Sequence, residues 1–357
     1  MGLVLLIAAV IWGAGIVTRT PVSLRLWGIA VVWLGVVLAH LVLPEGHALR
    51  ARTGGSAAPW LMLGGFVVLA GAYRWLLKGL RTKAQLREVD AAAGQTEGPF
   101  RDAELRRYAR HIVLREVGGP GQVKLKQAKI LVIGAGGLGS PALMYLAAAG
   151  VGTIGVIDDD AVDGTNLQRQ VIHGDADIGR PKAHSAADRM RAINPFIEVR
   201  PYARRLIAEE AEALIGDYDL VLDGTDNFDT RYLANRVCVA LGKPLISGAL
   251  TQWEGQVSVF DPAHSAPCYQ CVFPEAPAPG LAPSCAEAGV IGPLPGVVGS
   301  MMAVEAVKVI TGAGAALRGE MMIYDALWGE SRKIRVKPRA DCPVCHGAGL
   351  AEAAGKA

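Results

Sequence analysis

The chain has 357 residues, with 36 Lys and Arg against 33 Asp and Glu and a net charge of +3. This near balance gives no electrostatic reason to expect a nucleic-acid partner. The length allows a sizeable core and more than one domain. Apolar residues make up 51% of the chain. They are concentrated in residues 1–80, which hold almost no acidic side chain, whereas the rest has the composition of an ordinary soluble enzyme.

Three apolar stretches near the N-terminus have the length of membrane-spanning helices, at residues 2–17, 26–43 and 60–77. A spanning helix needs about 20 apolar residues, and the range reaches down to ~17. None of the three has the polar stripe of a soluble amphipathic helix. We therefore expect residues 1–80 to form a membrane anchor of three transmembrane helices. The alternatives are buried helices of a soluble domain or a signal peptide at residues 1–17, which the absence of a basic residue before Arg19 disfavours.

Basic residues indicate the orientation of this anchor, because they favour the cytoplasmic side. A basic cluster begins at the end of the third stretch with Arg74 and continues after it with Lys78, Arg81, Lys83 and Arg87. We therefore expect an inner (cytoplasmic) membrane protein whose soluble part faces the cytoplasm. Residues 81–100 are expected to be a linker, 101–346 the soluble domain and 347–357 a flexible tail.

Beyond residue 128 short apolar strands alternate with helical segments. We expect strands at 129–134, 153–158, 197–202, 220–223, 244–248 and 255–260, helices at 138–149, 182–194, 208–214, 230–241 and 297–310, and a hairpin at 321–336. This alternation predicts an α/β protein with a doubly wound, mostly parallel, Rossmann-like sheet. The hairpin adds antiparallel strands at the C-terminal side.

A glycine turn follows the first of these strands in the sequence GAGGLG, with glycines at 134, 136, 137 and 139. Backbone amides in such a turn, together with the following helix N-terminus, favour a phosphate. Asp158 stands at the end of the next strand, where an acid accepts ribose hydroxyls. Taken alone, this pattern favours NAD or FAD.

The residues that follow are not those of a dehydrogenase. NLQRQ supplies Asn166 and Arg169, and GRPK supplies Lys182. Two cations are excessive for a pyrophosphate, but around a triphosphate they neutralise charge as a phosphoryl bond breaks. The alternatives are a surface ion pair for Arg169 and a solvated position at a helix N-terminus for Lys182.

A third strand ends in DGTDN, with Asp223 and Asp226 followed by Asn227. Acids at the carboxyl ends of parallel strands line the ligand crevice, and Asp226 could hold Mg²⁺ together with phosphates. The alternative is that one of the two acids caps the helix that begins near Thr230.

Four of the six cysteines form two CxxC pairs, Cys268 with Cys271 and Cys342 with Cys345. Four thiolates suit a closed tetrahedral Zn²⁺ site of structural type. Two disulfides are the alternative, disfavoured in a reducing compartment. Cys238 is expected in the core. Cys285 follows a Pro- and Ala-rich loop and is either a nucleophile or a small residue near the site.

Together, RYARHIVL, GAGGLGS, NLQRQ, GRPK, DGTDN, CYQC, CAEAGVIGP and CPVC resemble the MoeB/ThiF/HesA family, the prokaryotic branch of the ubiquitin-activating enzyme superfamily. The resemblance covers about residues 101–346. It implies an adenylyltransferase that uses ATP and Mg²⁺ to adenylate the C-terminal glycine of a small ubiquitin-like sulfur carrier ending in Gly-Gly. A MoaD-like carrier of molybdenum cofactor biosynthesis is the first expectation and a ThiS-like carrier of thiamine biosynthesis the second. An NAD-dependent oxidoreductase and a non-catalytic scaffold are alternatives of other classes.

The resemblance also implies roles for the motif residues. The glycines at 134, 136, 137 and 139 approach ATP, Asp158 takes the ribose, Asn166, Arg169 and Lys182 hold the phosphates, and Asp226 binds Mg²⁺. Arg110 matches an arginine that reaches the ATP of a partner subunit, which implies a homodimer. Cys285 matches a cysteine that carries a thioester or persulfide in some members, and the four CxxC cysteines match zinc ligands. No rhodanese-like domain follows Cys345, so a separate sulfur donor is expected.

Overall fold

The computed structural model describes residues 2–91, 98–278 and 288–346. The chain divides into two compact units, Met1–Gln95 and Thr96–Ala357. Each unit is described by itself.

The first unit is entirely helical in its described part. Its helices are α1 (Gly2–Val17), α2 (Val22–Val42), α3 (Ala48–Thr53) and α4 (Ala58–Ala91). The first two form a hairpin that contacts α3, and α4 contacts α2. Helix α4 contains the third apolar stretch and continues without a break into the expected linker at residues 81–100, as far as Ala91.

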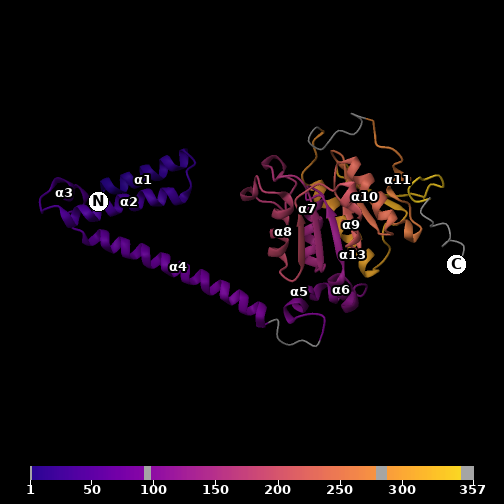
Figure 1. Ribbon diagram of the computed structural model, residues 1–357, viewed down its shortest axis with the longest axis horizontal. Coiled ribbons are helices and arrows are strands. Elements are labelled where there is room, and N and C mark those ends of the chain that lie inside the picture. The colour runs from indigo at the N-terminus through magenta and orange to yellow at the C-terminus, as the bar shows by residue number, and fades with distance from the viewer. Residues whose placement is uncertain (1, 92–97, 279–287, 347–357) are drawn as a thin grey trace. The chain divides into compact units, whose positions relative to one another are not determined.

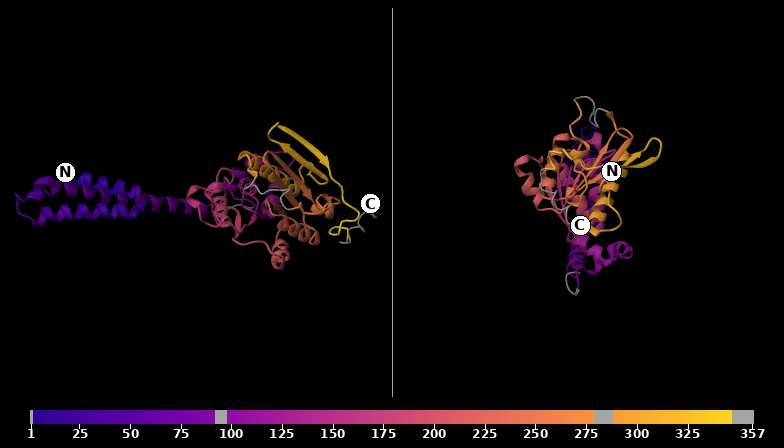
Figure 2. Two further views of the ribbon diagram at one scale, coloured as in Figure 1. Left: turned by 90° about the horizontal axis from the view of Figure 1, so that it is seen from above. Right: turned by 90° about the vertical axis from the view of Figure 1, so that its right-hand side faces the viewer.

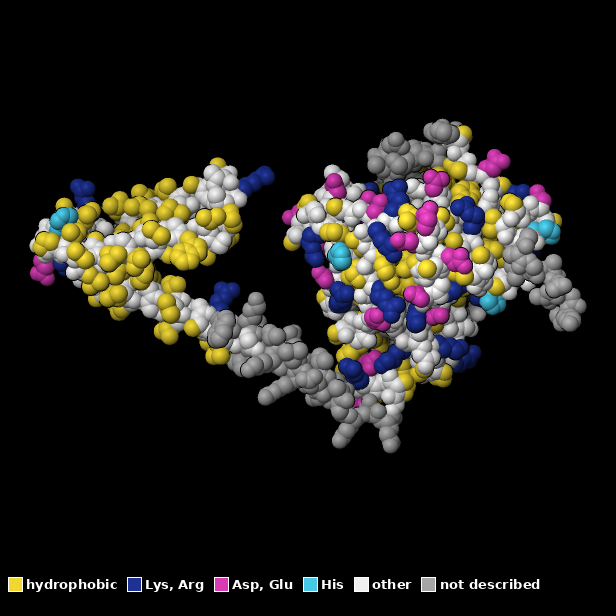
Figure 3. Space-filling model, viewed as in Figure 1, with side chains coloured by type: hydrophobic (Ala, Val, Ile, Leu, Met, Phe, Trp, Pro, Cys, Tyr) yellow, Lys and Arg dark blue, Asp and Glu magenta, His cyan; other side chains and the backbone are white. Residues whose placement is uncertain are grey.

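Many apolar side chains of this unit are exposed on its surface. Figure 3 shows hydrophobic side chains over the visible faces of α1, α2 and the first part of α4. Two polar contacts are buried in this unit: the hydroxyl of Thr53 is 2.9 Å from Nε2 of His40, and Trp60 donates its indole N–H to the Thr53 carbonyl at 3.0 Å. Buried residues also form an apolar cluster that consists of Val4, Val36, Val37 and Trp60. Apolar side chains therefore lie both inside this unit and on its surface.

By length and apolar composition, two described helices could cross a membrane: α2 and α13 (Pro293–Thr311). Helix α13 is half buried and packs on the β-sheet of the second unit, as a core helix does. Helix α2 is largely uncovered. The apolar parts of α1 and α4 are shorter than the same measure requires.

The second unit is built on one eight-stranded sheet in the order β3-β2-β1-β4-β5-β6-β7-β8. Figure 1 shows helices lying around the strands of this unit. Its strands are β1 (Lys129–Ile133), β2 (Thr153–Ile157), β3 (Glu198–Tyr202), β4 (Leu220–Asp223), β5 (Leu245–Leu250), β6 (Glu254–Phe260), β7 (Glu320–Asp325) and β8 (Glu330–Arg335). Strands β1 to β5 are parallel to one another, and β6 to β8 continue the sheet in antiparallel fashion. Figure 2 shows the yellow β7–β8 hairpin at the edge of the sheet. The predicted parallel core with antiparallel C-terminal strands is confirmed.

Helices cover both faces of this sheet. The described helices of the second unit are α5 (Asp102–Ile112), α6 (Gly118–Gln127), α7 (Gly139–Ala149), α8 (Lys182–Ile193), α9 (Ala208–Gly216), α10 (Phe228–Ala240), α11 (Tyr269–Val272) and α13. Successive residues of β1 point to opposite faces: Ile130 and Val132 pack with α7, α8 and α13, while Leu131 and Ile133 pack with α9 and α10. All four are buried, which explains why the strand reads as one apolar run rather than an alternation.

Candidate functional site

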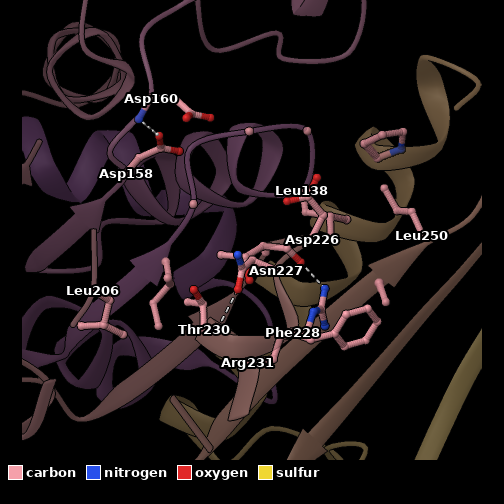
Figure 4. A pocket seen from close by; sticks show the side chains of 18 of the residues that line it. Leu138, Asp158, Asp160, Leu206, Asp226, Asn227, Phe228, Thr230, Arg231 and Leu250 are labelled. Atoms are coloured by element: carbon pink, nitrogen blue, oxygen red, sulfur yellow. Dashed lines mark hydrogen bonds between the residues drawn. The ribbon is translucent and has the colours of Figure 1, made fainter. Parts of the chain in front are cut away.

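A cavity of about 700 Å³ opens at the carboxyl ends of the parallel strands. The chain leaves β1 and β4, which are neighbours in the sheet, for helices on opposite faces, since α7 lies in one core and α10 in the other. Such a switch point leaves a crevice where ligands bind in open α/β sheets. Figure 4 shows Asp158 and Asp160 on one side of this cavity and the loop with Asp226 and Asn227 on another.

Three of the four predicted glycines line the cavity, namely Gly134, Gly136 and Gly137. Gly134 has φ +93°, a conformation that side chains disfavour. Gly139 is not among the lining residues. A Cβ at Gly139 would lie 1.9 Å from the carbonyl oxygen of Gly134, so glycine is needed there to let the helix α7 approach the turn.

Asp158 follows β2 directly and lines the cavity. One carboxylate oxygen accepts the Ala135 N–H at 2.7 Å and the other accepts the Asp160 N–H at 2.9 Å. Burial raises the pKa of Asp158, although these hydrogen bonds and the nearby Lys182 cation partly oppose the rise. Asp158 thus joins the glycine turn to the loop that follows β2.

Lys182, the first residue of α8, is 5% exposed, so its reading as a solvated residue at a helix N-terminus is wrong. Its ammonium donates to Asp160 at 2.7 Å and lies on the cavity. Arg169 lines the same cavity and is half-buried. Its guanidinium donates to the Asn166 side-chain oxygen at 2.8 Å. The partner of Arg169 is thus a neutral amide and not the carboxylate that a surface ion pair would require. Asn166 does not line the cavity; it holds Arg169.

The loop after β4 separates the two acids of DGTDN. Asp226 is exposed and lines the cavity. Asp223 is fully buried and accepts from the backbone N–H and the hydroxyl of Thr225 at 3.1 and 2.7 Å. Neither acid caps α10. The cap is Asn227, whose side-chain oxygen accepts the Thr230 N–H at 3.0 Å.

Arg231 is a site residue that the sequence analysis did not single out. It is 4% exposed and lies in the first turn of α10 (Figure 4). It donates to the carbonyls of Thr225 and Gly248, to the Ser247 hydroxyl at 3.0 Å, and forms an ion pair with Asp223 at 3.6 Å. Arg231 therefore fixes the loop that carries Asp226. The signal in the sequence is an arginine four residues after the helix cap, on the helix face that packs against the strands.

The cavity is also lined by residues that do not belong to the sequence motifs. Two arginines, Arg204 and Arg205, follow β3, and Arg205 pairs with Asp159 at 3.1 Å. Aromatic side chains of Phe228, Tyr269 and Phe273 form an apolar part of the wall.

Arg110 does not line the cavity of its own chain. It is exposed on α5, whose Tyr108 hydroxyl accepts from Asn194 at 2.8 Å. Asn194 ends α8, a helix of 12 residues whose opposite end carries Lys182. A helix of that length spans about 18 Å. Helix α5 is therefore packed at the end of α8 remote from the cavity. Cys285 lies outside the described residues.

The four CxxC cysteines converge, with all their sulfurs within 4.8 Å of one another. Sulfurs of Cys268 and Cys342 are 3.6 Å apart and those of Cys271 and Cys345 are 3.3 Å apart. A tetrahedral Zn²⁺ with bonds of about 2.3 Å places its sulfurs at about 3.8 Å. A disulfide would need about 2.05 Å, so the disulfide alternative does not hold, and the donor set fits a zinc ion.

An open α/β sheet with a glycine turn, two cations and strand-end carboxylates at its switch point defines a nucleotide-binding protein of the Rossmann-like class. Residues 108–344 match the ThiF family, and the chain belongs to this family.

Two named relatives and a solved structure are similar to this chain. The chain is 51% identical over 246 residues to the sulfur carrier protein adenylyltransferase of Thermus thermophilus, covering 68% of this chain and 91% of that one. It is 52% identical to the probable adenylyltransferase/sulfurtransferase MoeZ of Mycobacterium tuberculosis, covering 67% of this chain and 62% of that one. Among solved structures, MccB of E. coli in complex with MccA-N7isoAsn has a TM-score of 0.60 at 23% identity, covering 67% of this chain and 74% of that one, which shows a shared fold.

Proposed function

We propose that this chain is an ATP-dependent adenylyltransferase that activates the C-terminal glycine of a small ubiquitin-like sulfur carrier. The observation that carries this proposal is the convergence of Asp158, Arg169, Lys182 and Asp226 with the glycine turn on one cavity. A carboxylate is a poor acyl donor. In the proposed reaction its oxygen attacks the α-phosphorus, the bond from that phosphorus to the bridging oxygen breaks, and pyrophosphate leaves with the bond's electron pair. The product is an acyl adenylate.

This reaction needs charge neutralisation and positioning more than it needs a base. The carrier carboxylate is ionised at neutral pH, so no proton has to be removed from the nucleophile. In the proposed complex Arg169 and Lys182 balance the negative charge of the triphosphate, and Asp158 accepts ribose hydroxyls. The glycine turn offers backbone amides at the N-terminus of α7.

Asp226 is the residue proposed to hold Mg²⁺. Its carboxylate is exposed on the cavity wall, and no side chain of residues 2–91, 98–278 or 288–346 forms a hydrogen bond with it. Hard oxygen ligands of this kind, completed by phosphates and water, are what Mg²⁺ prefers. When bound, the ion would supply further neutralisation of the phosphate charge. Arg231 and Asp223 keep the loop in place behind it.

A MoaD-like carrier of molybdenum cofactor biosynthesis is our first candidate and a ThiS-like carrier of thiamine biosynthesis our second. The names of the relatives support a sulfur carrier without choosing between these two. The sulfur itself is proposed to come from a separate donor, and Cys285 remains a candidate for a covalent link to the carrier.

Carrier-dependent exchange between ATP and labelled pyrophosphate tests the proposal, with the purified full chain and each cellular carrier that ends in Gly-Gly. We expect exchange with one carrier and none with a carrier whose last glycine is deleted. Absence of exchange with every carrier contradicts the adenylation proposal. Formation or consumption of NADH with a small substrate would favour the oxidoreductase alternative.

We also propose a homodimer in which Arg110 serves the cavity of the partner subunit, because α5 is remote from the cavity of its own chain. Mixing an Arg110→Ala chain with a Lys182→Met chain tests this idea. Half of the dimers in an equal mixture are mixed, and each has one site with both residues intact, so about a quarter of the wild-type activity should return. If the mixture stays as inactive as its components, Arg110 does not act across subunits.

We further propose that the first unit anchors the enzyme in the inner membrane through three spans, with the second unit in the cytoplasm where ATP is available. Support comes from the apolar exterior of α1, α2 and the first part of α4. Reporter fusions after Leu43 and after Arg87 test the topology. A fusion after Arg87 that reports a periplasmic position contradicts it.

A further inference from the structure

We propose that His173 is a positioning residue that fixes the glycine turn in its nucleotide-binding conformation. The inference rests on the proposed function, because the turn is taken to bind ATP. His173 lies three residues after Gln170, the end of the NLQRQ motif, and does not line the cavity.

The imidazole is buried between the glycine turn and α8, with 7% of the residue exposed. Nε2 is 2.9 Å from the carbonyl oxygen of Ala135, and Nδ1 is 2.8 Å from the hydroxyl of Ser185. A carbonyl oxygen only accepts hydrogen bonds, so Nε2 must carry a proton. In the neutral ring Nδ1 then accepts from the Ser185 hydroxyl. Both ring nitrogens are satisfied, and the ring has one defined orientation.

Ala135 is held from both sides by this arrangement. Its carbonyl accepts from His173, and its N–H donates to Asp158 at 2.7 Å. The residues on either side are Gly134 and Gly136, which have wide conformational freedom. A turn rich in glycine has little preference of its own. The two hydrogen bonds at Ala135 therefore act together with those of the Gly134 N–H to the Ile157 carbonyl and of the Ser140 N–H to the Gly136 carbonyl, both at 2.9 Å, to hold one conformation out of many. His173 thereby orients the backbone around which the phosphates are proposed to bind.

Burial lowers the pKa of His173, and the Lys182 cation acts in the same direction. The hydrogen bond to Ala135 and the charges of Asp158 and Asp177 oppose this decrease without reversing it. A neutral ring therefore fits the tautomer that the hydrogen bonds require. It also avoids placing a second buried cation beside Lys182.

Two amide substitutions separate the turn contact from general packing. In His173→Gln the side-chain nitrogen can occupy the place of Nε2 and still donate to Ala135. In His173→Asn the shorter side chain reaches only the place of Nδ1, toward Ser185. We expect the Asn variant to raise KM for ATP by about tenfold, as for loss of one buried hydrogen bond. Its kcat should change less than twofold, and KM for the carrier should not change.

The Gln variant should restore KM for ATP to within about threefold of wild type. Ser185→Ala, which removes the support of Nδ1 and leaves the ring, should raise KM for ATP by a smaller factor than His173→Asn. It also keeps the test decisive if the Asn chain does not fold, because an unchanged KM in Ser185→Ala then overturns the proposal. Equal KM values in the Gln and Asn variants, or equal effects on ATP and carrier, overturn it too. Because exchange by the wild-type chain is measured first, failure of the adenylation proposal is distinguished from failure of this one.

Discussion

The ammonium of Lys182 donates to the carboxylate of Asp160 at 2.7 Å, with the lysine side chain 6% exposed and the aspartate side chain 66% exposed. A buried cation is thus paired with an accessible anion at the edge of the cavity. A triphosphate can compete for this lysine without a rearrangement of the core, since the carboxylate that it leaves is already in contact with water.

Replacing Lys182 by Met should therefore abolish activity and leave the fold intact. We expect pyrophosphate exchange to fall at least about a hundredfold, as is typical for loss of one preorganised charge contact. The free energy of unfolding should change by less than about 1 kcal/mol, because the remaining Asp160 is solvated. Exchange kinetics and urea unfolding of the same preparations give both quantities.

Asp160→Asn is the matched control. It removes the anion, keeps the shape and leaves Lys182 available to phosphate, so exchange should stay within about threefold of wild type. Comparable losses in both variants would mean that the pair acts as one structural unit and that Lys182 has no separate role.

Arg169→Ala should also abolish exchange, because the guanidinium is proposed to bind phosphate. Its partner in the structure is the Asn166 side chain, at 2.8 Å. Asn166→Ala should consequently cause a smaller loss, of about tenfold, through disorder of the arginine. Arg189→Ala, an exposed arginine on α8, serves as the control. Exchange by Arg169→Ala at the wild-type rate would remove NLQRQ from the site.

The parts of the site that depend on neighbouring residues in the chain could be predicted from the sequence. The parts that depend on contacts between distant segments could not. The glycine turn follows from GAGGLG because a strand, a tight turn and a helix are local events. Burial of Lys182 is not local: an antiparallel bridge between Ala161 and Pro181 brings Asp160 beside it. No periodicity in either segment indicates that bridge.

Arg231 illustrates the same limit for the core. A helix over residues 230–241 was predictable, and α10 covers Phe228–Ala240. The buried face of that helix is decided by its packing on β4 and β5, which places Arg231 against Asp223 and Ser247. Arginine is rarely buried, so composition argued for a solvated position.

Arg231→Met should destabilise the second unit strongly. It leaves the fully buried Asp223 without its cation, and removing one partner of a buried ion pair costs about 3–5 kcal/mol. Urea unfolding measures the loss, and Arg236→Met, on the exposed side of α10, should cost less than about 0.5 kcal/mol. A double variant, Asp223→Leu with Arg231→Met, should recover part of the stability. No recovery would indicate that the hydrogen bonds of Arg231 to the loop carbonyls matter more than the charge pair.

The four-cysteine site is expected to bind zinc, and removal of the ion should lower the thermal stability of the second unit. The four sulfurs join the segment after β6 to the segment after β8, which are 71 or more residues apart in the chain. Treatment with a thiol reagent and a chelator should release one Zn²⁺ per chain, measured with a zinc indicator. Adding Zn²⁺ back to the chain stripped by the chelator alone should restore the melting temperature. Cys268→Ser should lose the metal, whereas Cys238→Ala should keep it, since Cys238 lies in α10 outside the cluster. A chain that contains no zinc when purified with its four cysteines reduced would contradict the assignment.

The pH dependence of stability should carry a contribution from His173. Burial lowers its pKa from the ordinary value of 6.5. Between the lowered pKa and 6.5 the unfolded chain binds more protons than the folded chain, so stability falls as the pH falls through this window. Above 6.5 both states are neutral and the contribution is fully present. Charged groups that face the ring are Lys182, Asp158 and Asp177.

His173→Gln removes the titrating group and keeps a donor to Ala135. Unfolding by urea at intervals between pH 7.5 and pH 5 should therefore show a steeper loss of stability in the wild-type chain than in this variant. The other histidines contribute equally to both proteins and cancel in the difference. Parallel curves would contradict this prediction, because they would mean that the pKa of the ring is the same in the folded and the unfolded chain.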